Sequence, residues 1–321
     1  MRFLKTVVFI MSLVLLGGCS KSDRNSPETP DAGPINKETA VKQTDRITFT
    51  DDLGYEIEMD APKKTAVLSG SLTDAWLLAG GEAAAATEDA KDILENAGNW
   101  VSLGTLKTPG VETMIAEEID FVILSGAIAE HVRLRETLEN AGITTAYFIV
   151  ETFEDYAAMM KILTGITGRK DLYQSNAEAL SAEIETQIAR ADESRPSVLF
   201  LRAYSTGVKA QGSDSMTGRM LQDLGCVNIA DREGSLLEDL SMEAIIAADP
   251  DYIFVTTMGE SQEDALAMVD GLLISNPAWS GLTAVKENRY YVLPKELFHI
   301  KPNKRWGESY RILADYLYGE E

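Results

Sequence analysis

Two side chains that could hold a charged ligand follow an apolar run in the second half of the chain. Arg202 and Tyr204 come directly after residues 198–201, a run typical of a buried strand. A guanidinium and a phenol suit an anionic or aromatic ligand, because they make charge-assisted hydrogen bonds and stacking contacts. An ion pair of Arg202 at the surface or between two lobes is the alternative.

A histidine near the C-terminus could bind metal. His299 could be an axial ligand of haem iron, with Met258 or Tyr204 on the opposite side. A histidine that makes structural hydrogen bonds is the alternative. The chain has only two histidines and two cysteines, which leaves little room for a multi-histidine metal site or a disulfide framework. We therefore expect no resident metal or cofactor.

These residues need strands and helices to position them. From residue 45 onward, short apolar runs alternate with helical patterns, which predicts an α/β fold with mostly parallel sheets. Ligands of such sheets lie beyond the carboxyl ends of the strands. The remaining candidates near these ends are Ser69, Ser71, Ser125 and Thr257, with Trp100 and Arg219 as secondary candidates.

The length of 321 residues exceeds what one hydrophobic core usually organises. We expect two Rossmann-like lobes, at 46–170 and 195–321, with a ligand cleft between them. Residues 171–194 read as one connecting helix, because Leu180, Ile184 and Ile188 are four apart on one face. A surface helix within one larger domain is the alternative.

A weak internal repeat supports the two-lobed arrangement. Residues 111–124 match residues 242–255 at a constant offset of 131, and Glu, Ile, Ala and Asp are identical at matching places. Each copy predicts a short helix, a turn with an aspartate, and a buried strand. Glu112 and Glu243 open the two helices, where a negative charge gains roughly 0.3–1 kcal/mol from the helix dipole. That local stabilisation is one explanation of both glutamates.

The N-terminus has the pattern of an exported lipoprotein. Arg2 and Lys5 precede an uncharged run, Thr6 to Ser20, which is 15 residues long and shorter than the ~20 that span a bilayer. Residues 16–19, Leu-Gly-Gly-Cys, resemble a bacterial lipobox, so we expect a signal peptide at 1–18 and a diacylglycerol on Cys19. An ordinary secretory signal with a chance cysteine is the alternative. The Pro- and Ser-containing segment 19–45 predicts a disordered linker.

Charge and motifs exclude several functions. The formal net charge of -22 would repel nucleic-acid backbones. The sequence contains no Gly-x-Ser-x-Gly, His-Glu-x-x-His, Walker or Cys-x-x-Cys motif, so enzymatic readings find little support. A lipid-anchored hydrolase and an adhesion or wall-binding lipoprotein are kept as alternatives.

The order of several segments resembles the substrate-binding lipoproteins of ABC importers that capture ferric siderophores, haem and cobalamin. The likeness covers roughly residues 45–320. It depends on the two repeat units and on the segments Phe49 to Gly54, Gln211 to Asp214, Asn276 to Trp279 and the end at Arg305-Trp306. The resemblance implies two lobes joined by a rigid helix. It also implies that Glu112 and Glu243 dock into arginine pockets of a permease dimer.

The sequence therefore predicts a monomeric receptor on the extracytoplasmic face of a bacterial membrane. It would capture an iron(III) siderophore or a related metal chelate and deliver it to a permease with its ATPase subunits. Haem or cobalamin is the alternative ligand. The scarcity of histidine argues against haem, and the few basic residues near strand ends argue against a multi-anionic siderophore.

Overall fold

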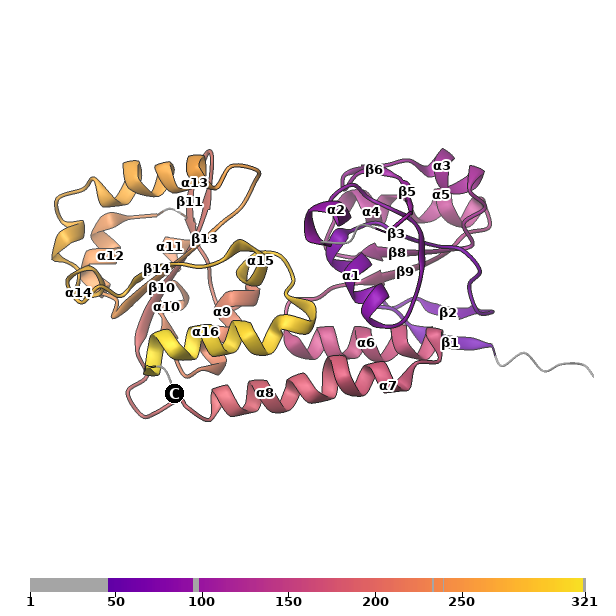
Figure 1. Cartoon of the computed structure of the whole chain (residues 1–321). Helices are drawn as coiled ribbons and strands as arrows, with labels where there is room; N and C mark the ends of the chain where they lie inside the picture. The colour runs from indigo at the N-terminus through magenta and orange to yellow at the C-terminus, as the bar shows by residue number, and fades with distance from the viewer. Residues whose placement is uncertain (1–45, 95–97, 233, 239, 320–321) are drawn as a thin grey trace, which may run out of the picture. The chain divides into compact units, whose positions relative to one another are not determined.

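The computed structural model describes residues 46–94, 98–232, 234–238 and 240–319. The predicted signal peptide at 1–18, the linker at 19–45 and Cys19 lie outside the described residues. Within the described residues, no helix combines the length and the apolar character that crossing a membrane requires. Residues 44–321 form one compact unit, and Figure 1 shows its elements.

The first lobe is built on a five-stranded sheet in which every strand is parallel to its neighbours. Its order is β5-β4-β3-β8-β9. The strands are β3 (Thr65–Val67), β4 (Ala83–Ala86), β5 (Val101–Ser102), β8 (Phe121–Ser125) and β9 (Thr144–Phe148). The helices are α1 (Gly70–Leu78), α2 (Ala90–Ile93), α3 (Val111–Ala116), α4 (Ala129–Arg133) and α5 (Arg135–Asn140). Two antiparallel pairs flank them: β1 (Ile47–Thr50) with β2 (Glu56–Met59), and β6 (Gly104–Thr105) with β7 (Thr108–Pro109).

The second lobe has a sheet of the same kind with one antiparallel edge. Its order is β11-β10-β13-β14, and β12 also pairs with β10. The strands are β10 (Ser197–Tyr204), β11 (Gly207–Ala210), β12 (Val227–Asn228), β13 (Tyr252–Thr257) and β14 (Tyr290–Val292). Only β11 runs antiparallel to its neighbour among these described pairs. The predicted α/β fold with mostly parallel sheets is confirmed.

Helices follow the strands of the second lobe as well. They are α9 (Met216–Asp223), α10 (Ile229–Arg232), α11 (Ser235–Glu238), α12 (Met242–Ala248), α13 (Gln262–Val269), η2 (Asp270–Ile274), η3 (Trp279–Gly281), α14 (Thr283–Lys286), α15 (Lys295–Phe298), η4 (Asn303–Arg305) and α16 (Trp306–Tyr318). The last helix, α16, packs against α8 (Ala179–Ile188) of the segment that connects the lobes.

Alternate residues of each sheet face different hydrophobic clusters. In β8, Val122 and Leu124 belong to a cluster that stays within the first lobe, whereas Phe121 and Ile123 belong to a second cluster. That second cluster also contains Phe200 of β10, and it continues through α6, α8 and α16. A third cluster lies on the other face of the second sheet. The two lobes therefore share a core.

The connecting segment differs from the single helix predicted at 171–194. Helix α6 (Phe153–Thr167) ends at Gly168, whose φ of 73° is the left-handed conformation that glycine adopts readily. A second helical stretch then runs through α7 (Lys170–Tyr173), the π-helical turn η1 (Gln174–Glu178) and α8 (Ala179–Ile188). It stops at Ile188, six residues before the predicted boundary. Asp192 then accepts a hydrogen bond from the Ser194 N–H, and Pro196 precedes β10, so a turn replaces the last helical turns.

The two repeat copies fold in the same way. Glu118 and Asp249 occupy matching positions with left-handed φ angles of 56° and 39°. Asp120 then accepts hydrogen bonds from the backbone of Lys63 and Lys64, directly before β3. Its counterpart Asp251 accepts from the backbone N–H of Ser197 at 2.8 Å, where β10 begins. In each lobe, the aspartate that the two copies share holds the start of the neighbouring strand.

Candidate functional site

Four basic side chains gather where the second lobe meets the segment after α15. We call Arg202, Lys295, His299 and Lys301 the basic cluster. Burial, together with the positive charges of the other three members, lowers the pKa of His299 to about 4. His299 is therefore neutral near pH 7. The cluster is a local concentration of positive charge in a chain whose formal net charge is -22.

Several polar atoms near this cluster are buried without a hydrogen-bond partner among the described residues. They include Arg202 Nε, His299 Nδ1 and Thr256 Oγ1. Arg202 and Thr256 are opposite each other in the parallel pairing of β10 with β13, so their side chains share one face of the sheet. A buried donor or acceptor without a partner costs roughly 1–3 kcal/mol. A ligand that supplied partners for these atoms would recover part of that cost.

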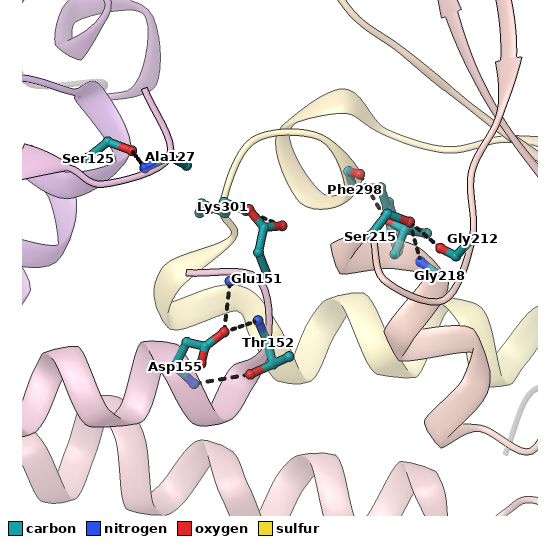
Figure 2. Close-up of polar contacts among 11 residues, drawn as sticks. Ser125, Ala127, Glu151, Thr152, Asp155, Gly212, Ser215, Gly218, Phe298 and Lys301 are labelled. Atoms are coloured by element: carbon teal, nitrogen blue, oxygen red, sulfur yellow. Dashed lines mark hydrogen bonds and ion pairs between the residues drawn. The ribbon is translucent and has the colours of Figure 1, made fainter. Parts of the chain in front are cut away.

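An acidic side chain from the other lobe contacts the basic cluster. Lys301 Nζ lies 3.1 Å from Glu151 Oε2. Glu151 lies two residues before α6, next to the N-cap residue Thr152, and its backbone N–H donates to Asp155 at 3.0 Å. Thr152 and Asp155 form a capping box at the start of this helix, with distances of 2.9 and 3.1 Å, so the position of Glu151 is well defined (Figure 2). Burial lowers the pKa of Lys301, whereas Glu151 raises it.

The same segment lines a cavity between the lobes. The cavity has a volume of about 620 Å³, and its walls come from α1, α2 and residues 296–305. Lys301, Lys304 and Arg305 contribute positive charge to the wall, and Asp74 and Asp92 contribute negative charge. Burial raises the pKa of Asp74. A cavity of this size, with charged groups on both sides, suits a polar small molecule.

One buried asparagine bridges the lobes beside this cavity. Asn303 is only 1% exposed, and its φ of 48° lies in the left-handed region. Its Nδ2 donates to Ser71 O and to Asp74 Oδ2, both at 2.8 Å. Both acceptors belong to α1 of the first lobe. Asn303 therefore holds the segment after α15 against α1.

The predicted serines of the first lobe lie at strand ends, where they make local hydrogen bonds. Ser69 Oγ is 3.2 Å from Ser71 Oγ, and Ser69 is 8% exposed. Ser125 Oγ accepts from the Ala127 N–H at 3.3 Å (Figure 2). The other histidine, His131, is fully buried and accepts from the Ser125 N–H through Nδ1. His131 is thus a structural residue that shapes the loop after β8.

The remaining predicted residues of the second lobe lie in different environments. Tyr204 is the last residue of β10 and is partly buried, and Thr257 is almost fully buried in β13. Met258 is 40% exposed, and its N–H donates to Ala203 O. Arg219 lies on α9, where its side chain is 45% exposed and pairs with Asp223 at 2.9 Å. Asp223 therefore already neutralises Arg219.

Trp100 directly precedes the edge strand β5. Because Val101 pairs with Ala85, and Ala85 with Ala66, Trp100 is level with the first half of β3 rather than with its carboxyl end. Its role in ligand binding stays a prediction, as do those of the other candidates. Lys295, Lys301 and Asn303 had no place among the predicted site residues. Lys295 follows the end of β14 by three positions, whereas Lys301 and Asn303 follow it by nine and eleven. Lys301 follows His299 by only two positions.

A tight loop leads into α9 in the second lobe. Ser215 Oγ accepts from the Gly218 N–H at 3.3 Å and donates to Gly212 O at 2.7 Å (Figure 2). A Cβ atom on Gly218 would lie 2.0 Å from Gly212 O, so only glycine fits there. This loop includes the segment Gln211 to Asp214 on which the family resemblance depends.

The sequence of the chain matches a known protein family. The model of the periplasmic binding protein family matches residues 66–297. The Bacillus subtilis (strain 168) protein YhfQ, whose name describes an ABC transporter substrate-binding lipoprotein, is 21% identical in an alignment 319 positions long that covers 92% of this chain and 93% of YhfQ.

Two solved structures share the fold. The catecholate-siderophore binding protein VctP from Vibrio cholerae has a TM-score of 0.66 at 15% identity, covering 85% of this chain and 99% of VctP. Staphylococcus aureus IsdE in complex with haem has a TM-score of 0.66 at 16% identity, covering 79% of this chain and 98% of IsdE. The family match, the two parallel sheets and the shared fold lead to one conclusion: the chain belongs to the periplasmic binding protein family, whose members bind a solute rather than transform it.

Proposed function

We propose that this chain is the substrate-binding lipoprotein of an ABC importer, and that it captures an anionic metal chelate such as an iron(III) siderophore. The observation that carries this proposal is the basic cluster of a strongly acidic protein, in which Arg202 Nε and His299 Nδ1 are buried without a partner among the described residues. VctP, which shares the fold, binds a catecholate siderophore. YhfQ, which is similar along nearly its whole length, is named as an ABC transporter lipoprotein.

The geometry suggests a role for each group in capture. Arg202 and Lys301 supply charge-assisted hydrogen bonds to the carboxylate or catecholate oxygens of the ligand. Thr256 adds a neutral partner. Tyr204, at the end of β10, offers a ring for stacking on an aromatic ligand. Because the core and the helices α6–α8 connect both lobes, capture involves only a modest closure of the cleft.

Delivery depends on features outside the cleft. A diacylglycerol on Cys19 would hold the protein on the extracytoplasmic face of the bacterial membrane, where two acyl chains give stable anchoring. The monomer would then dock on a permease dimer, which carries the ATPase subunits on its other side. Glu112 and Glu243 are exposed in the first turns of α3 and α12, so both carboxylates are accessible to basic residues of the permease.

A binding panel tests the proposed ligand class. Purified protein is titrated with ferric catecholate, ferric hydroxamate, ferric citrate, haem and cobalamin, and tryptophan fluorescence reports binding. We expect a ferric chelate to bind, and we expect Arg202→Ala and Lys301→Ala each to weaken it by about tenfold or more. Arg311→Ala, which removes an exposed ion pair with Asp315, serves as the control. Unchanged affinity in both cluster variants would contradict the proposal.

Haem is the second candidate, because His299 is neutral and its Nδ1 is buried without a partner among the described residues. The haem-bound structure of IsdE has the same fold. If His299 bound haem iron, with Met258 or Tyr204 opposite, the protein would show a Soret band that His299→Ala shifts or removes. A Soret band that is identical in the variant would exclude this histidine as a ligand.

A further inference from the structure

The cavity between the lobes has walls of opposite charge. On the first-lobe side, α1 and residues 87–94 together contain four acidic residues and one basic residue. On the other side, residues 295–305 contain four basic residues and one acidic residue, and His299 is neutral. The charged residues that line the cavity itself are Asp74 and Asp92 on the first side and Glu296, Lys301, Lys304 and Arg305 on the second. Each wall therefore carries a net charge, and the two net charges have opposite signs.

These opposite charges do not pair with each other across the cavity. Within the described residues, no ion pair joins residues 295–305 to α1 or to α2. Lys301 pairs instead with Glu151, before α6, and Arg305 pairs with Glu308 of α16 at 2.6 Å. The contacts of Asn303 with α1 come from a neutral amide. If the charges served only to hold the lobes together, ion pairs across the cavity would be expected, so their separation favours a charged ligand between the walls.

Two oxygen atoms beside the acidic wall are buried without a hydrogen-bond partner among the described residues. They are Thr87 Oγ1 and Asp89 Oδ1, and Thr87 is 0% exposed. The other oxygen of Asp89, Oδ2, accepts from the Gly70 N–H at 2.7 Å. A Cβ atom on Gly70 would lie 2.6 Å from Ile93 Cδ1, and Ile93 lines the cavity. Because an ionised carboxylate can only accept hydrogen bonds, a group that satisfied Asp89 would have to be a donor.

Asp74 offers another acceptor, on the cavity wall itself. Its Oδ2 accepts from Asn303, whereas its Oδ1 accepts no hydrogen bond from the described residues. Burial raises the pKa of Asp74, and a cation beside it would favour the charged form. A protonated amine supplies both a positive charge and N–H donors, and its hydrogen bonds to carboxylates are charge-assisted. An ammonium group therefore fits this wall better than a neutral donor does.

We infer that the captured chelate is amphoteric: its anionic, metal-binding part lies against the basic cluster, and a protonated amine on its opposite side lies against Asp74 and Asp92. Lys301 belongs both to the basic cluster and to the cavity wall, so one ligand can reach both groups. This inference rests on the proposed function, and it adds the two aspartates as residues that determine specificity. A chelate with negative charge on every side would meet uncompensated carboxylates on the first lobe, which select against it.

Two probes that differ only in the amine test this inference. One is the iron(III) complex of 2,3-dihydroxybenzoyl-lysine amide, which has an anionic catecholate core and ammonium groups at its periphery. The other is the same complex after acetylation of the lysine side chains, which removes the positive charge and leaves the core intact. Tryptophan fluorescence titration in about 150 mM salt, which screens distant charges, measures both affinities. We expect wild-type protein to bind the amine-bearing probe about five- to tenfold more tightly, because each carboxylate contributes up to about fivefold.

Asparagine variants locate the preference on the acidic wall. We expect Asp74→Asn and Asp92→Asn each to reduce it, and the double variant to bind both probes equally. Asparagine keeps an acceptor oxygen for Asn303, so the contact between the lobes is retained. Asp171→Asn, which removes an exposed carboxylate on α7, is the control and should keep the full preference.

The outcomes separate this inference from the proposed function. Equal affinity of wild-type protein for the two probes, or a preference that persists in the double variant, would overturn the inference and leave the proposed function standing. If neither probe binds, the inference fails, and the panel of ferric chelates and haem then decides by itself whether the proposed function fails as well.

Discussion

At the scale of single residues, a few polar atoms of the basic cluster are buried without a partner. Arg202 Nε and His299 Nδ1 have no partner among the described residues, and the adjacent positive charges help to keep His299 neutral. The sequence predicted both residues, because Arg202 follows an apolar run and His299 is one of only two histidines. Lys301 was not predictable in this way, since it reaches the cluster through the chain path after α15.

The low pKa of His299 makes stability depend on pH. Its pKa is about 4 in the folded protein and ~6.5 when unfolded. The unfolded state therefore binds more protons between these values, so the contribution of His299 to stability is complete above pH 6.5 and is lost as the pH falls toward 4. We expect wild-type protein to lose more stability than His299→Gln between pH 7 and pH 5 in urea unfolding. Parallel losses in the two proteins would contradict the low pKa.

Glu151 forms an ion pair with Lys301 in the structure, and it would compete with an anionic ligand for the same ammonium group. We expect Glu151→Gln to increase the affinity for an anionic ferric chelate by about two- to fivefold, because a partly exposed ion pair is worth up to ~1 kcal/mol. Asp171→Asn removes another exposed ion pair, with Arg169, and should leave affinity unchanged. Fluorescence titration measures both variants, and weaker binding by Glu151→Gln would show that Glu151 helps to hold the ligand.

At the level of elements, hydrophobic periodicity predicted the type and order of the helices and strands better than their boundaries. The apolar runs at 198–201 and 121–124 lie in β10 and β8, because their side chains are buried on both faces of a parallel sheet. The connecting helix ends earlier in the chain than the predicted residue 194. A turn held by Asp192 stops it at Ile188, and helical pattern alone does not reveal such a competing hydrogen bond.

Sequence analysis named only His299 as a site candidate in the segment 299–305. Its buried Asn303 donates to Ser71 O and Asp74 Oδ2 across the lobes. Asn303→Gly keeps the left-handed backbone available but removes both hydrogen bonds, so we expect a loss of about 1–3 kcal/mol in the free energy of unfolding. Asn288→Gly, at an exposed position with a φ of 56°, is the matched control. Equal stability of the two variants would mean that the bridge contributes nothing.

At the scale of the whole molecule, the repeat places one exposed glutamate on each lobe, and we propose that both dock on the permease. The charge reversals Glu112→Arg and Glu243→Arg change exposed residues, so the fold and ligand affinity should be preserved. We expect the double variant to lose uptake of the chelate identified in the binding panel, because like charges repel at the docking contacts. Uptake of the iron-55 complex by cells measures transport, and fluorescence titration provides the control. Wild-type uptake by the double variant would remove the docking role of both residues.

The hydrophobic cluster that runs from Phe121 to Phe200 through α6, α8 and α16 has a consequence for the history of this architecture. Although the two lobes contain matching repeat units, neither lobe has a complete hydrophobic core by itself. If one lobe were replaced by that of a distant relative, its side-chain volumes would not match those of the other lobe in the shared core. The replacement would therefore destabilise both lobes. New cargo specificities are therefore expected to arise by changes to the loops that border the cleft, while both halves descend together as one inherited piece.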